Sequence, residues 1–112
     1  MHRVRLQQPS ADAVASLLDL PPRQTAALRV GSVQLEPGQR VPGEGLSRHG
    51  VDEVSLIVSG SLTGECGGEA FSIGEGDVTW IPAGEEHWAV AGQHGAEIFW
   101  VWFGDVAGED AD

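Results

Sequence analysis

Short runs of alternating apolar and polar residues, separated by glycine, constrain the fold of this chain more than any other feature of its sequence. The run at 27–35 alternates in this way, and a second run at 53–58 does the same. Alternation with a period of two is typical of a β-strand that has one buried face. The chain has 16 glycines among its 112 residues, with no repeating period between them. The sequence therefore predicts an all-β sandwich or barrel with many turns.

Further strands are predicted on both sides of these two runs. Residues 62–65 and 70–73 are expected to form a hairpin, and Cys66 at its tip is expected to be a surface thiol. The run at 97–103 is apolar at almost every position, which predicts a strand that is buried on both faces. The other predicted elements are strands at 4–6, 47–49, 78–81 and 87–90, a turn at 59–61 and a loop at 91–95.

One short helix is predicted before the first long strand. Ser10 is a suitable N-cap, because its hydroxyl can accept a hydrogen bond from the first turn. Val14, Leu17 and Leu18 follow at helical spacing, and Pro21 ends the pattern. This amphipathic helix is expected to cover one edge or end of the sheet.

The length of 112 residues fits one domain, 1–112, with a barrel core at about 25–104 and a disordered acidic tail at 105–112. The chain carries 17 acidic and 6 basic residues, which gives a net charge of −11. A surface of this charge repels nucleic acids and anionic membranes, so neither is an expected partner. We find no apolar run of membrane-spanning length and no secretory signal, and we expect a cytoplasmic protein.

Two clusters of residues carry the chemistry of this sequence. In the first, His49, Glu53 and Gly60 are separated by three and six residues. In the second, Gly76 is followed by Pro82-Ala83-Gly84 and then by His87. Each histidine falls on or beside a predicted strand, and the two clusters lie on neighbouring strands.

These clusters resemble the two motifs of the cupins, G-x5-H-x-H-x3-4-E-x6-G and G-x5-P-x-G-x2-H-x3-N. The resemblance covers about 30–103 and implies a double-stranded β-helix, also called a jelly-roll barrel. Two departures are clear, because Ser47 stands at the first histidine of the H-x-H pair and Ala91 stands at the asparagine. The leading glycine of the first motif is also out of register.

Cupins with the full motifs bind a metal through three histidines and one glutamate. The resemblance therefore implies that His49, Glu53 and His87 are the metal-binding and catalytic residues of this chain. Two imidazoles and one carboxylate can hold one divalent ion, for which iron, zinc, manganese and nickel are the candidates. The implied function is a metal-dependent enzyme, of oxygenase, isomerase, cyclase or lyase type, that acts on a small organic molecule in the barrel pocket.

Two alternatives stay open at the level of the sequence. Without a metal, the same three side chains would act as general acid and base in an apolar pocket. The barrel would otherwise be a non-catalytic module that binds or senses a small molecule. The resemblance also implies a homodimer, formed through the strand 98–103 and the N-terminal segment.

Several other polar and aromatic side chains have an expected place. Trp100 and Trp102 share one face of their strand, and a tryptophan that lines the barrel would suit a flat, apolar substrate. Arg40 lies in the loop at the expected pocket rim, where it would meet a carboxylate or form a surface ion pair. Glu85 and His94 are expected at the surface.

Overall fold

The computed structural model describes residues 1–5 and 27–104, and every regular element in these ranges is a strand. The predicted helix that begins at Ser10 and the predicted tail at 105–112 lie outside the described residues. Within the described ranges, no helix is long and apolar enough to cross a membrane. The strands are β1 (His2–Arg5), β2 (Ala27–Leu35), β3 (Arg40–Val41), β4 (Asp52–Cys66), β5 (Glu69–Gly74), β6 (Asp77–Ile81) and β7 (His87–Gly104).

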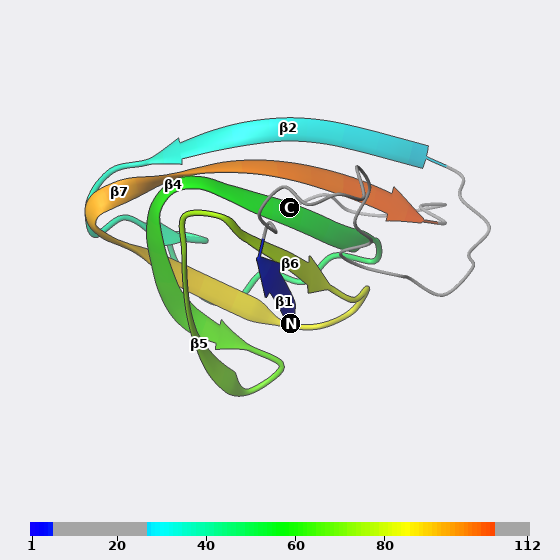
Figure 1. Cartoon of the computed structure of the whole chain (residues 1–112). Helices are drawn as coiled ribbons and strands as arrows, with labels where there is room; N and C mark the ends of the chain where they lie inside the picture. Colours follow the sequence, from blue (N-terminus) through cyan, green and yellow to red (C-terminus); the bar gives the residue numbers. More distant parts are fainter. Residues whose placement is uncertain (6–26, 105–112) are drawn as a thin grey trace, which may run out of the picture.

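Two long strands, β4 and β7, form the frame of the molecule. They pair antiparallel along almost their whole lengths, from Asp52 with Phe103 to Cys66 with His87. The sheet order is β1-β6-β4-β7-β2, while β5 pairs with the second half of β4 and β3 pairs with the first half of β7. Figure 1 shows both long strands curving, so that their two halves face each other as the walls of a barrel. This arrangement is the predicted double-stranded β-helix.

The curvature is concentrated where β4 and β7 change register. Shifts in the pairing fall between Ile57 and Ser59 and between Gly60 and Leu62. Gly60 has a φ of +80°, a conformation that favours glycine. The turn predicted at 59–61 and the loop predicted at 91–95 are therefore wrong, because both are bends inside continuous strands. The bulges turn the strands through the corner without ending their pairing.

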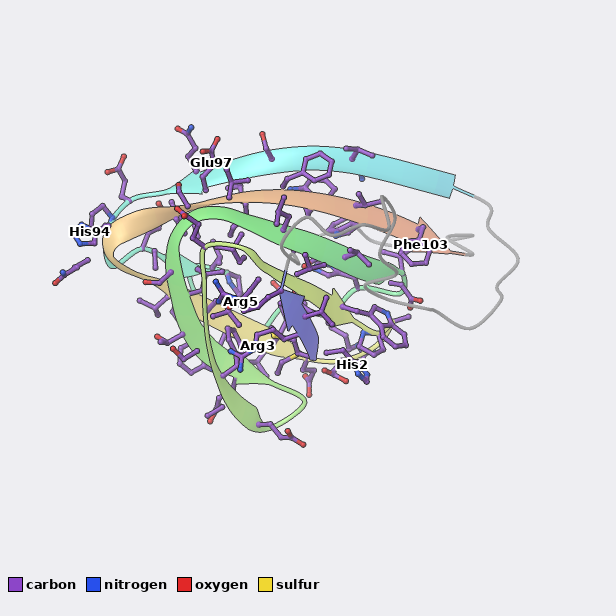
Figure 2. The ribbon with its side chains drawn as sticks, in the orientation of Figure 1. His2, Arg3, Arg5, His94, Glu97 and Phe103 are labelled. Carbon is purple, nitrogen blue, oxygen red and sulfur yellow. The ribbon has the colours of Figure 1, made fainter. Side chains whose placement is uncertain are left out.

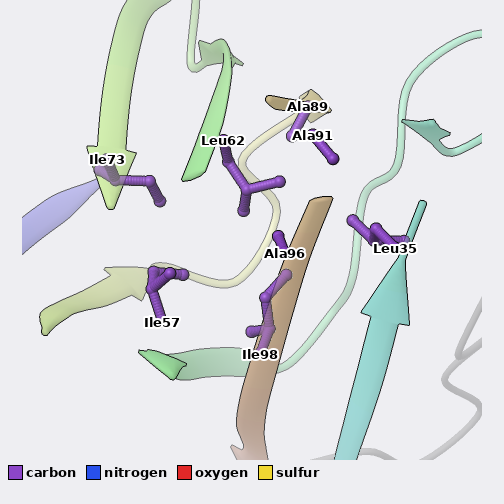
Figure 3. Close-up of a cluster of buried hydrophobic side chains, with 8 residues drawn as sticks. All are labelled: Leu35, Ile57, Leu62, Ile73, Ala89, Ala91, Ala96 and Ile98. Atoms are coloured by element: carbon purple, nitrogen blue, oxygen red, sulfur yellow. The ribbon is translucent and has the colours of Figure 1, made fainter. Parts of the chain in front are cut away.

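The core lies at this corner, on the concave side of the curved strands (Figure 3). Ile57 is only 1% exposed, and its register partner Ile98 is also buried. Phe99, the next residue of β7, is 42% exposed. The prediction that 97–103 is buried on both faces is therefore wrong, since alternate residues of β7 face outward. The buried cluster consists of Leu35, Ile57, Leu62, Ile73, Ala89, Ala91, Ala96 and Ile98.

Candidate functional site

A cavity of about 390 Å³ opens inside the barrel. Its walls are mostly apolar, and its polar groups come from β2, β4, β6, β7 and the loop before β4. A space of this size and character suits a small organic molecule. The polar side chains that line it are Arg29, Ser47, His49, Glu53, Ser55, Thr79 and His87.

His49 lies in the loop just before β4 and is 6% exposed. Its carbonyl oxygen accepts a hydrogen bond from the backbone N–H of Gly84 at 2.7 Å. The glycine turn of the second motif therefore anchors the histidine of the first motif. The Nε2 atom of His49 lies 3.8 Å from Oε1 of Glu53, four residues further along the chain. A protonated His49 would form an ion pair with Glu53 at this distance.

His87 begins β7 and lies beside Ser47. The backbones of the two residues exchange hydrogen bonds of 2.8 and 2.9 Å. Nδ1 of His87 lies 3.0 Å from the carbonyl oxygen of Glu85, which can only accept, so Nδ1 carries the proton. The Nε2 atom of neutral His87 therefore keeps a lone pair. The rings of His49 and His87 have centroids 5.1 Å apart, so the structure brings His49, Glu53 and His87 to one cavity.

Trp102 holds Glu53 in place from the neighbouring strand. The two residues are register partners on β7 and β4, so they point to the same face of the sheet. The indole N–H of Trp102 donates to Oε1 of Glu53 at 2.5 Å, and the hydroxyl of Ser55 donates to Oε2 at 3.4 Å. The Trp102 ring also contacts His49, with centroids 4.4 Å apart. A tryptophan was predicted to line the barrel, and the structure places both Trp100 and Trp102 at the cavity.

The placement of these side chains does not complete a metal site. In the part of the chain that the structure describes, no group of three or more His, Cys, Asp or Glu residues is arranged to hold a metal ion. One oxygen of Glu53 accepts a hydrogen bond from Trp102 and the other from Ser55, and each oxygen keeps a further lone pair. Ser47 contributes only a neutral hydroxyl, which is a weak ligand. Metal binding by His49, Glu53 and His87 therefore stays a prediction.

Arg29 lines the cavity and was missed by the sequence analysis. It is the register partner of Trp102 on β2, and its guanidinium carbon lies 5.6 Å from the centroid of the Trp102 ring. The arginine named in its place, Arg40, is not a lining residue and lies over the ring of Trp88 at 5.0 Å. Only the register of β2 against β7, which places Arg29 beside Trp102, identifies it as a lining residue.

Cys66 and Glu85 also differ from expectation. Cys66 is 3% exposed and its thiol donates to Oε1 of Glu85 at 2.8 Å, so the predicted surface thiol is wrong. The same oxygen accepts from the Met1 ammonium group at 2.6 Å, and the Glu85 side chain is 26% exposed. Burial, together with the hydrogen bond to Glu85, raises the pKa of Cys66 to about 12. Burial alone would raise the pKa of Glu85, but the hydrogen bonds from Cys66 and Met1 outweigh it and lower that pKa. His94 is exposed at the bend of β7, as predicted (Figure 2).

The raised pKa predicts that Cys66 is unreactive in the folded protein. At pH 8 the native thiol is expected to react with a disulfide reagent at least about 100-fold more slowly than the unfolded chain, because little thiolate is present and access is limited. The measurement is the rate of colour release from Ellman's reagent with and without guanidinium chloride. Cys66→Ser is the control, since it should remove the signal in both conditions. Equal rates for native and unfolded protein would contradict the burial of the thiol.

Comparisons with solved structures agree with this fold. An RmlC-like cupin from Shewanella frigidimarina is 20% identical, with a TM-score of 0.59, and the match covers 68% of this chain and 65% of that one. A predicted oxalate decarboxylase from Thermotoga maritima is 28% identical, with a TM-score of 0.56, over 65% and 63% of the two chains. The DMSP lyase DddQ from Ruegeria pomeroyi is 22% identical, with a TM-score of 0.62, over 70% and 39%. This chain thus covers less than two thirds of each of these three proteins.

A comparison with curated proteins found no match. A family model described as the cupin domain matches residues 31–102, which is more than half of the chain. The match spans both clusters that resemble the cupin motifs. The barrel of β4 and β7 and the similar solved structures support the same assignment. The chain belongs to the cupin family.

Proposed function

We propose that this protein is an enzyme that acts on a small organic molecule in the barrel cavity, with His49, Glu53 and His87 as its catalytic groups. The observation that supports this most directly is the meeting of two imidazoles and one carboxylate at a single, largely apolar cavity. Proton transfer in enzymes relies on these side chains. Two of the similar structures are described as a lyase and as a predicted decarboxylase, which are names of enzymes for small molecules.

The arrangement suits a reaction that moves a proton within one substrate. The lone pair on Nε2 of His87 is suited to accept a proton from a carbon or a hydroxyl group. His49 in its protonated form would return a proton to the substrate, and Oε1 of Glu53 lies 3.8 Å from its Nε2 atom. Trp102 fixes the Glu53 carboxylate during both steps. Isomerisation, cyclisation and elimination are reactions of this kind.

A metal-dependent enzyme is the second candidate. It is favoured by the spacing of His49, Glu53 and His87, which is that of cupin metal ligands, and by their shared cavity. The hydrogen bonds from Trp102 and Ser55 would orient the Glu53 carboxylate in such a site, because carboxylates that bind a metal commonly accept hydrogen bonds as well. Iron, zinc, manganese and nickel remain the ions to test.

One experiment separates the candidates. First, the metal content of tag-free protein is measured by mass spectrometry before and after each ion is added. The protein is then incubated with a metabolite extract, and the amount of each compound is followed by mass spectrometry. The variants are His49→Gln and His87→Gln, and the control is His94→Ala, since His94 is exposed at the bend of β7. We expect one compound to be consumed by wild type and control, with a loss of about 100-fold or more in rate in either glutamine variant.

The outcomes have distinct meanings. Consumption by protein that takes up no metal supports proton transfer by the side chains alone. Consumption that requires a bound ion, present in the control but absent from both glutamine variants, supports the metal-dependent enzyme. Retention of a compound without any turnover would show a binding module and sink the enzymatic proposal.

A further inference from the structure

We infer that the cavity selects small molecules that carry a carboxylate, which Arg29 binds at the opening while the body of the molecule lies against Trp100 and Trp102. The inference rests on the proposed function, because it concerns the ligand of the same cavity. It adds the chemical class of that ligand and the residue that recognises it. None of the three proposed catalytic side chains is needed for this recognition.

The first support is the position of Arg29. Its side chain is on the inward face of β2, opposite Trp102, yet the residue as a whole is exposed. A residue that lines the cavity and also reaches solvent lies at the opening. Trp102 supports the guanidinium group from one side, at 5.6 Å between Cζ and the ring centroid. Within residues 1–5 and 27–104 no carboxylate forms an ion pair with Arg29, so its N–H groups can reach a ligand.

The second support is the distribution of charge. The chain has a net charge of −11 and contains no lysine. Among the described residues that line the cavity, Arg29 is the only arginine, and it lies at the opening. The only lining carboxylate in that part of the chain, Glu53, already accepts hydrogen bonds from Trp102 and Ser55. At an ionic strength of about 0.1 M, salt largely screens acidic groups that lie more than about 10 Å away. An anion that enters therefore meets the guanidinium group first, and a carboxylate matches its planar fork of donors.

The third support is the shape of the wall behind Arg29. The rings of Trp100 and Trp102 lie with their centroids 5.0 Å apart at an angle of 38°. Phe71 and Ile57 also line the cavity and add to its apolar surface. Flat rings pack well against such aromatic surfaces. A planar molecule with a carboxylate at one end can thus bind Arg29 with that end and place the other end toward His49 and His87.

Two probes of the same shape test the inference. Calorimetry would measure the binding of 2-naphthoate and of its neutral analogue 2-naphthamide to the whole chain. We expect wild-type protein to prefer the acid by about tenfold or more, which is the size of one charge-assisted hydrogen bond. Arg29→Met should lower the affinity for the acid to that for the amide and leave the amide unchanged. Arg29→Lys should keep part of the preference, and Arg48→Met is the control, because Arg48 is exposed and does not line the cavity.

The results distinguish this inference from the proposed function. Unchanged binding of the amide by Arg29→Met shows that the variant is folded with its cavity intact. Equal affinity of wild type for acid and amide, or an equal loss of both in Arg29→Met, overturns the role of Arg29 while the cavity remains a binding site. Failure of both probes to bind at millimolar concentration also overturns the inference, whereas the enzymatic proposal is judged by the consumption of compounds.

Discussion

Replacing Gly60 with alanine is expected to lower the free energy of unfolding by about 2–5 kcal/mol. The φ of +80° at Gly60 belongs to the left-handed region, in which a residue with a Cβ loses about 1–2 kcal/mol. A Cβ at this position would also overlap the carbonyl oxygen of Gly95 and lie 2.8 Å from Cα of Ala96. Both atoms belong to the backbone of β7, so relief requires the long strands to separate at their corner. A domain of this size is stable by only about 5–15 kcal/mol, so the loss is a large fraction.

Alanine substitutions at two other glycines separate the effect of the positive φ from the effect of the overlap with β7. Gly68 has a φ of +82° but open space around its Cβ position, so Gly68→Ala should show the conformational effect alone, about 1–2 kcal/mol. Gly43 has open space as well, and its φ is not positive, so Gly43→Ala should stay within about 0.5 kcal/mol of wild type. Urea unfolding followed by tryptophan fluorescence measures all three. If Gly60→Ala and Gly68→Ala lose equal stability, the close approach of β4 and β7 at the corner is not a source of strain.

Gly60 also shows why the sequence predicts where strands lie but not which neighbouring strands join into one long strand. The strand at 27–35 has the predicted bounds, and the hairpin around Cys66 is confirmed, because both depend on local alternation and turn residues. A glycine with positive φ serves a bulge as well as it serves a turn, so the residue itself does not distinguish the two. Only the pairing of β4 with β7 on both sides of Gly60 and Gly95 shows that the strands continue. That pairing is distant in sequence and leaves no local signal.

The same distinction applies to the site. His49, Glu53 and His87 could be named from the sequence, because their spacing follows a family motif. Arg29 could not, since it reaches the cavity only through the register of β2 against β7. The predicted metal ligation and the predicted homodimer stay predictions, because each depends on a molecule other than this chain.

The burial of Cys66 is another feature that the local sequence does not predict. The place of Cys66 at a hairpin was predicted, but its side chain is buried in the folded protein, where Cys66 also pairs with His87 of β7. Glu85 then meets the thiol from a turn 19 residues away. The exposure of the thiol therefore depends on a residue outside the hairpin, and the hairpin sequence alone carries no information on that residue.

Replacing Gly31 with alanine is expected to weaken the binding of 2-naphthamide by about tenfold or more. A Cβ at Gly31 would overlap Cζ2 of Trp100 and lie 2.8 Å from its Cε2. Gly31 and Trp100 are register partners, and Cη2 of the ring also lies 3.0 Å from the added Cβ, so the ring, which lines the cavity, has to shift. Forcing one more carbon into a packed site costs about 1–3 kcal/mol, and about 1.4 kcal/mol is a factor of ten in affinity.

The test compares Gly31→Ala in two backgrounds by calorimetry. In wild type the added methyl group displaces the indole and narrows the cavity. In Trp100→Leu no ring lies over position 31, so the same change should leave the affinity for 2-naphthamide unaltered. A double-mutant cycle gives the coupling between the two positions. Equal effects of Gly31→Ala in both backgrounds would mean that Gly31 acts on the strand β2 itself, and that Trp100 does not set the depth of the cavity.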